Sequence, residues 1–259
     1  MKRALILFWH GLGDIIMLTP HLRHLYNEGY KTDLMCLPET RTSRILEHCP
    51  YVGKLIDVEN PWRKDDRQLE GLRSRKEFDE KATCNLEKFE TLRKDYDWSG
   101  ASPHYMGRYN LRHKIDTTSV ELGVRLKSKR MEVFIPESAE SEARKYMDGD
   151  YIFVHTKPRF HAYHNWDATE WMKENLPPLR IINTGYEEEH FMAFDNINTA
   201  FVIVREAKHR VLSSSVFLPA CVSMGCVIDV INYGRPDHKV WPVDQSKILH
   251  IREKGKWIK

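Results

Sequence analysis

The stretch that most constrains this chain is residues 4–25, ALILFWHGLGDIIMLTPHLRHL, which joins an apolar segment to a helical one through a glycine turn. Residues 4–9 are mostly apolar and stop abruptly at His10, which predicts a buried strand. Gly11 and Gly13 allow backbone amides to approach a ligand closely, and the helix N-terminus behind them favours negative charge. The turn is therefore a candidate binding or catalytic site.

Glycine turns of this kind also occur in dinucleotide-binding proteins. Their fingerprint, G-x-G-x-x-G, requires a third glycine, and Ile16 stands at that position here. This departure argues against a nicotinamide or flavin enzyme. A reading without any site is an ordinary strand–turn–helix unit in which Asp14 caps the helix.

The motif continues beyond the turn as G-x-G-D, then T-P, then L-R-x-L. Its members are Asp14, Thr19, Pro20, Leu22, Arg23 and Leu25. This order resembles the opening of the glycosyltransferase family 9 (heptosyltransferase-like) enzymes. The resemblance implies an α/β fold of the GT-B type, in which two Rossmann-like domains face a central cleft. It also implies that Asp14 is the catalytic base.

The size and composition of the chain set broad limits. Its 259 residues are enough for one large domain or two of moderate size. No run approaches the ~18 apolar residues of a membrane span, and the first apolar run is too short for a signal peptide, so we expect a cytoplasmic protein. The five cysteines are odd in number and form no C-x-x-C pair, which indicates reduced thiols rather than a zinc site or a disulfide framework.

The formal net charge of +3 is unevenly distributed. The chain has 24 Lys and Arg against 19 Asp and Glu up to Arg130, and 16 against 18 after it. Such an excess is often only a solvated surface, but it also suits a phosphate-bearing partner or peripheral contact with an anionic surface.

Strand and helix patterns alternate twice along the chain, which predicts two parallel sheets covered by helices. We place the boundary near Pro136, with an acceptor-side domain of residues 1–136 and a nucleotide-sugar-binding domain of residues 137–259. Further expected strands are residues 32–37, 54–58, 132–135, 151–155, 180–183, 201–204, 210–212 and 227–231, and expected helices are residues 42–48, 117–122, 138–147 and 168–175.

The middle of the first half is rich in charge. Residues 62–94 interleave cations and acids over a weak helical stripe, which indicates either exposed helices or a flap over a large anionic acceptor. Residues 98–113 place aromatic side chains between cations, an arrangement that stacks on sugars or bases or packs beneath a loop. The acceptor-side candidates are His10, Gly11, Gly13, Arg108 and Arg112.

In the second half, residues 151–156 (YIFVHT), followed by Trp166 and Trp171, resemble the family strand that ends in His and a small residue. The family has a Lys two residues before that Trp, which contacts the donor phosphates, whereas this chain has His164. Lys157 and Arg159 lie in the same loop and would supply the cationic stabilisation that a leaving diphosphate needs. No carboxylate or Cys completes a metal site with the nearby histidines, so we expect no metal.

Residues 207–232 resemble the family segment that runs through an Asp-Ser/Thr-Gly turn into a helix. Three serines, Ser213 to Ser215, replace that turn; they would hold a diphosphate or simply cap the helix. Arg235 occupies the place of the family's G-P-T loop. The donor-side candidates are His155, Thr156, Lys157, Arg159, Ser213, Ser214, Ser215 and Arg235.

These features predict an inverting glycosyltransferase that needs no cofactor and uses a nucleotide-diphosphate sugar as donor. Asp14 would deprotonate the acceptor hydroxyl. Two anionic acceptors remain open: a saccharide of the lipopolysaccharide core, or a hydroxymethylated DNA base, as for some phage glycosyltransferases. The alternatives are a non-catalytic nucleotide- or sugar-binding protein of the same fold and, less well supported, a dinucleotide-dependent reductase.

Overall fold

The structure is a computed structural model of the whole chain, and it describes residues 1–62, 74–103, 114–156, 168–184, 196–213, 215–232, 250–251 and 257–258. Contacts within the chain divide it into two compact units, Met1–Glu132 and Val133–Lys259. Pro136, the expected boundary, lies shortly after this division.

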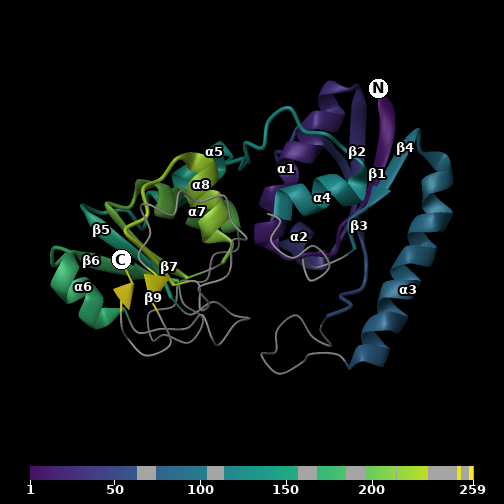
Figure 1. Cartoon of the computed structure of the whole chain (residues 1–259). Coiled ribbons are helices and arrows are strands. Elements are labelled where there is room, and N and C mark those ends of the chain that lie inside the picture. Colours follow the sequence, from purple (N-terminus) through teal and green to yellow (C-terminus); the bar gives the residue numbers. More distant parts are fainter. Residues whose placement is uncertain are drawn as a thin grey trace. The chain divides into compact units, whose positions relative to one another are not determined.

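The first unit is built on a parallel sheet with the strand order β3-β2-β1-β4 (Figure 1). Its elements are β1 (Lys2–Leu7), α1 (Leu12–Asn27), β2 (Tyr30–Cys36), α2 (Pro38–Thr42), β3 (Val52–Asp57), α3 (Arg75–Leu92), a short 3-10 turn (Arg93–Asp95), β4 (Trp98–Ala101) and α4 (Lys114–Leu122). The strand predicted over residues 4–9 is present but begins and ends two residues earlier.

The two faces of this sheet are covered by different helices, because side chains alternate along a strand. Leu5 and Leu7 of β1 pack with Phe89 of α3 in one buried cluster. On β4, a Cβ added to Gly100 would come within 2.9 Å of Leu122 in α4, so the glycine lets this helix lie close to the sheet. Residues 75–92, predicted as exposed helices or a flap, therefore form the helix that connects β3 to β4.

Helix α1 runs without interruption through Pro20, although a proline at this position removes a main-chain donor. The carbonyl that loses its partner belongs to Ile16, four residues earlier. The Thr19 hydroxyl donates to that same carbonyl oxygen at 2.7 Å, so the T-P pair compensates for its own defect. The helix therefore begins well before Pro20 and includes it.

The same helix fixes the segment that leaves the first unit. The Glu132 amide donates to the Thr19 hydroxyl at 2.9 Å, and Arg23 forms an ion pair of 3.1 Å with the Glu132 carboxylate. Arg23 also donates to the carbonyl of Arg130. Thr19 and Arg23, two residues of the sequence motif, therefore hold residues 130 and 132 against helix α1.

The second unit also has a parallel sheet, with the order β6-β5-β7-β8. Its elements are α5 (Glu137–Ala143), β5 (Tyr151–His155), α6 (Thr169–Asn175), β6 (Arg180–Asn183), α7 (Ile197–Glu206), β7 (His209–Ser213), α8 (Phe217–Met224), β8 (Val230–Asn232), and the short antiparallel pair β9 (His250–Ile251) and β10 (Trp257–Ile258). Its buried core includes Ile152, Val154, Trp171 and Val211.

Three expected elements differ from the structure. Residues 201–204 are part of helix α7 rather than a strand, and residues 132–135 form no strand. The helix expected over residues 42–48 is displaced to Pro38–Thr42, because Pro38 starts a helix well. In the part of the chain that the structure describes, no helix is long and apolar enough to cross a membrane.

Candidate active site

The turn after β1 places Asp14 at the third residue of helix α1. Gly11 is the residue that caps the helix, so the expectation that Asp14 itself would be the cap is wrong. Instead, the Asp14 carboxylate folds back and accepts a hydrogen bond from the Gly11 amide. Gly11 has a φ of −69°, and an added Cβ there would meet only the Asp14 carboxylate, at 3.9 Å. Among the described residues, neither the backbone conformation nor the packing requires a glycine at this position.

Asp14 has a buried cation as its electrostatic partner. Lys114, the first residue of α4, is only 1% exposed, and its ammonium lies 5.3 Å from the centre of the Phe8 ring. Asp14 keeps some exposed surface, yet burial among protein atoms raises the pKa of its carboxyl, while the charge of Lys114 and the Gly11 amide oppose that rise. The carboxylate is thus a stronger base than an ordinary aspartate.

Glu121 completes the charge cluster from the other end of α4. Burial lowers the pKa of Lys114, and Asp14 and Glu121 act against this by favouring the ammonium form. The Ser102 hydroxyl, just after β4, donates to the Glu121 carboxylate. Lys114 therefore lies in the field of two carboxylates, one of which faces the turn.

His10 and Trp9 link the chain just after β1 to the chain just after β4. His10 is buried, with its Nε2 2.7 Å from the carbonyl oxygen of Ser102, and the Trp9 indole donates to the carbonyl of Pro103 at 3.0 Å. Both contacts join the end of β1 to the end of β4. Strand β1 lies between β2, which follows it in the chain, and β4, so this edge is a topological switch point, where ligands of open α/β sheets bind.

The second unit brings several donor-side candidates together at the corresponding edge of its own sheet. Strands β5 and β7 are neighbours there, with His155 opposite Leu212. The Ser213 hydroxyl donates to the carbonyl of Thr156 at 3.2 Å, and both residues are buried. Since β5 lies between β6 and β7, this edge is also a switch point.

His155 is held as a neutral imidazole at this edge. Its Nδ1 lies 2.9 Å from the hydroxyl oxygen of Thr184, and its ring packs edge-on against Phe217 with 4.8 Å between the ring centres. Burial lowers the pKa of His155 to about 4. The Ser215 hydroxyl accepts a hydrogen bond from the Phe217 amide at 3.3 Å, but the residue that caps α8 is Val216, so Ser215 is not the cap that the sequence suggested.

Other candidates lie outside the described residues, so the structure neither assembles nor separates them. They are Arg108, Arg112, Lys157, Arg159, Ser214 and Arg235. Within the described ranges, no group of three or more His, Cys, Asp and Glu is arranged to hold a metal ion.

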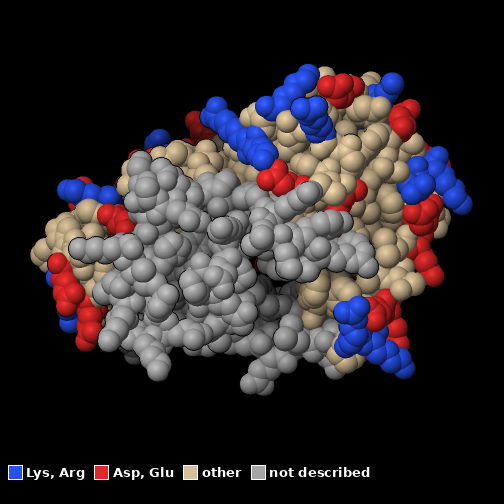
Figure 2. Space-filling view, in the orientation of Figure 1, with Lys and Arg blue, Asp and Glu red and all other residues tan. Residues whose placement is uncertain are grey.

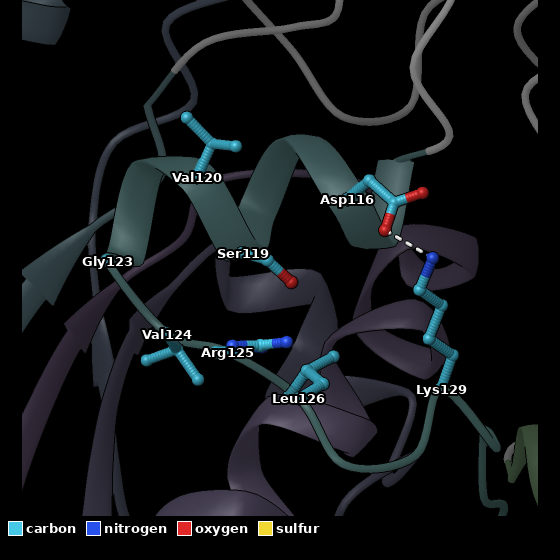
Figure 3. A pocket seen from close by; sticks show the side chains of 8 residues that line it. All are labelled: Asp116, Ser119, Val120, Gly123, Val124, Arg125, Leu126 and Lys129. Carbon is cyan, nitrogen blue, oxygen red and sulfur yellow. Dashed lines mark ion pairs between the residues drawn. The ribbon is translucent and has the colours of Figure 1, made fainter.

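A pocket of about 560 Å³ opens elsewhere on the first unit, along α4 and the segment that follows it (Figure 3). Its wall includes an ion pair of 2.6 Å between Asp116 and Lys129. Neither Asp14 nor Lys114 lines it. We therefore place the candidate site at the sheet edge and not in this pocket.

No protein-family model matches the sequence, and no curated protein matches it either. Solved structures do match. A family 9 glycosyl transferase from Veillonella parvula aligns with a TM-score of 0.61 and 15% identity over 97% of this chain and 87% of that one. The ADP-heptose lipopolysaccharide heptosyltransferase II of E. coli aligns with a TM-score of 0.55 and 13% identity over 97% of this chain and 90% of that one. The E. coli heptosyltransferase WaaC with ADP-2-deoxy-2-fluoro heptose aligns with a TM-score of 0.55 and 13% identity over 98% of this chain and 94% of that one.

The chain has the fold of the family 9 glycosyltransferases. The predicted GT-B class is therefore confirmed. The resemblance drawn from residues 11–25 identified the same family that the structural comparison finds at 15% identity.

Two residues of the site in this family 9 fold were missed in the sequence. Lys114 and Glu121 belong to a helix that was expected to start only at residue 117. Lysine is almost never fully buried unless it is paired, so the sequence position of Lys114 alone did not predict that it is buried. A signal did exist in the spacing, because both residues lie on one helix with apolar neighbours at Ile115 and Leu122.

Proposed function

We propose that this protein is an inverting glycosyltransferase that transfers a sugar from a nucleotide-diphosphate sugar to a hydroxyl group of an anionic acceptor. The observation that carries the proposal is a partly exposed Asp14 carboxylate, of raised pKa, beside a buried cation at the switch point of a family 9 fold. Such a group meets the requirements of a general base near neutral pH.

In the proposed reaction, Asp14 removes the proton of the acceptor hydroxyl as its oxygen attacks the anomeric carbon. The bond from that carbon to the diphosphate breaks on the opposite face, so the anomeric configuration inverts. The charge of Lys114 favours the ionised form of Asp14 before the proton arrives. The donor carries its own leaving group, and the reaction as proposed needs no cofactor.

We assign the donor to the sheet edge of the second unit. Thr156 and Ser213 lie together where β5 and β7 end, and α8 begins shortly after. Helix N-termini and strand-end amides of this kind bind phosphate groups. Lys157, Arg159, Ser214 and Arg235 remain the proposed cationic and hydroxyl contacts to the diphosphate.

The acceptor proposal rests on charge. Four exposed cations follow α4, namely Arg125, Lys127, Lys129 and Arg130. Figure 2 shows Lys and Arg along the upper edge of the face it presents and elsewhere on its rim, with Asp and Glu among them. Some of these cations are paired with acids, as Lys129 is with Asp116. A lipopolysaccharide-core saccharide is the acceptor class that we favour, because two of the structural neighbours are heptosyltransferases of E. coli and one is named for lipopolysaccharide.

The experiment that tests the proposal supplies ADP-heptose and other nucleotide sugars together with either a lipopolysaccharide-core acceptor or hydroxymethylated DNA. We expect a glycosylated product and release of a nucleoside diphosphate in one acceptor arm. A product formed on DNA alone would show that the acceptor is the hydroxymethylated DNA base and not the lipopolysaccharide core. A protein that binds a nucleotide sugar without transfer or hydrolysis in any arm would be the non-catalytic alternative.

A further inference from the structure

Two cysteines of the second unit are brought into contact by the way helix α8 ends. Gly225 adopts a left-handed conformation with a φ of 72°, and its amide donates to the Val222 carbonyl at 3.2 Å. The Cys226 amide donates to the Cys221 carbonyl at 2.9 Å. These two hydrogen bonds define the Schellman motif, in which the side chains at the positions of Cys221 and Cys226 meet.

The two thiols interact directly, and they are not equivalent. Proximity to the Cys221 thiol favours the thiolate form of Cys226. Cys221 is completely buried, whereas Cys226 is partly exposed. Of the two residues, Cys226 is therefore the one that solvent reaches.

A buried cation adjoins this pair. Arg210 of β7 is 8% exposed, and its guanidinium donates to the main-chain carbonyls of Val204 at 2.7 Å and Val227 at 3.0 Å. Among the residues that the structure describes, no carboxylate forms an ion pair with this guanidinium. The charge of Arg210 favours the thiolate form of Cys226, which would supply the compensating charge.

The thiols differ in acidity accordingly. The hydrogen bond from Cys221 and the charges of Arg210 and Arg205 lower the pKa of Cys226 to about 7, and the Cys221 pKa is raised. Burial raises the pKa of Cys36 to about 12 and that of Cys49 to about 11. Cys226 is therefore the most acidic of these four thiols.

We propose that Cys221 and Cys226 form a redox-sensitive dithiol that closes reversibly to a disulfide. The Cys226 thiolate attacks one oxygen of a peroxide; the O–O bond breaks, and a sulfenic acid forms as hydroxide leaves and is protonated. The Cys221 thiol then attacks the Cys226 sulfur, the S–OH bond breaks, and the hydroxyl leaves as water with the thiol proton. Two thiols have lost two electrons, and one hydrogen peroxide has become two waters.

The test is mass spectrometry of the full chain after exposure to one equivalent of hydrogen peroxide and removal of any unreacted peroxide. One tryptic peptide, beginning at Val211, contains both cysteines. We expect this peptide to lose two hydrogens and to regain them with a dithiol reductant. Persistence of both free thiols under conditions that oxidise Cys84, or conversion to sulfinic and sulfonic acids without a disulfide, would overturn the proposal.

Three variants sharpen the result. Cys221→Ser should trap the sulfenic acid on Cys226, which dimedone labels, and Cys226→Ser should leave Cys221 unmodified. Cys84→Ser removes an exposed thiol of α3 in the other unit and is the matched control, since it should leave the disulfide yield unchanged. Equal dimedone labelling of Cys84 and Cys226 would show that Cys226 has no special reactivity.

Discussion

At the scale of single residues, the site is a carboxylate and an ammonium held in one another's field. Asp14 is partly exposed, whereas Lys114 is buried and lies over the Phe8 ring. Burial pushes both groups toward their neutral forms, and each keeps the other charged. In the proposed mechanism, Asp14 is therefore the base and Lys114 a positioning residue.

Replacing Lys114 with methionine tests that role, because methionine fills a similar volume without charge. Asp14 would lose the cation that opposes the effect of burial, so its pKa should rise further. A base acts only when deprotonated, and the acid limb of the kcat/KM profile should therefore move to higher pH while the high-pH rate changes less. An acid limb at the wild-type position, in a variant shown to be folded by circular dichroism, would contradict the role.

The sequence was informative about residues only where a local pattern carries the chemistry. Gly11 and Asp14 were predicted because a glycine turn followed by an acid is a short-range signal. Lys114 was not, since its burial depends on Phe8 and Asp14, about a hundred positions away in the chain. His10 was expected on the acceptor side, and the structure places it in the interior against the Ser102 carbonyl.

At the scale of elements, α1 links the site to the end of the first unit. Its first turn holds Asp14, and its middle holds Thr19, whose hydroxyl serves both the Ile16 carbonyl and the Glu132 amide. The T-P part of the motif is explained by this arrangement without any contact to substrate.

Thr19→Val keeps the shape of the side chain and removes the hydroxyl. The Ile16 carbonyl would lose its donor and the Glu132 amide its acceptor, and one buried group left unsatisfied costs about 1–3 kcal/mol. The free energy of unfolding, measured by urea titration, should fall by about 2 kcal/mol. Thr19→Ser retains the hydroxyl and should lose much less. A valine variant as stable as the wild type would show that neither hydrogen bond matters to the fold.

The type of an element was predictable where its hydrophobic periodicity and the residues at its two ends indicated the same structure. The alternation of strands and helices gave both parallel sheets, but the apolar run at residues 201–204 is helical. Helix α7 is buried along residues 198–204, so its sequence lacks the polar stripe that distinguishes a helix from a buried strand. The available signal was Asn196, whose side chain accepts from the Asn198 amide and caps the helix.

At the scale of the whole molecule, each unit holds a histidine of lowered pKa, and we therefore expect the protein to lose stability in acid. Burial lowers the pKa of His21 to about 3 and that of His155 to about 4, whereas an unfolded chain protonates both near pH 6.5. Below that pH the unfolded state binds protons that the folded state does not. The free energy of unfolding should therefore decrease as the pH falls from about 6.5 toward 4.

Urea unfolding at pH 7.5 and at pH 5 measures this loss. Each histidine should contribute up to about 1.4 kcal/mol per pH unit within the window. His21→Asn should reduce the difference between the two conditions, and replacement of the exposed His48 with asparagine should leave it unchanged. Equal pH dependence in all three proteins would contradict the assignment of neutral buried histidines.

The central claim joins the fold to one reaction through Asp14, and its most direct measurement compares wild type with Asp14→Asn. Asparagine preserves the shape of the side chain but cannot take a proton. With donor and acceptor at saturation, sugar transfer should fall by about 10²–10⁴-fold. The dissociation constant for the nucleotide sugar should stay the same. A variant with near-normal turnover would contradict the account.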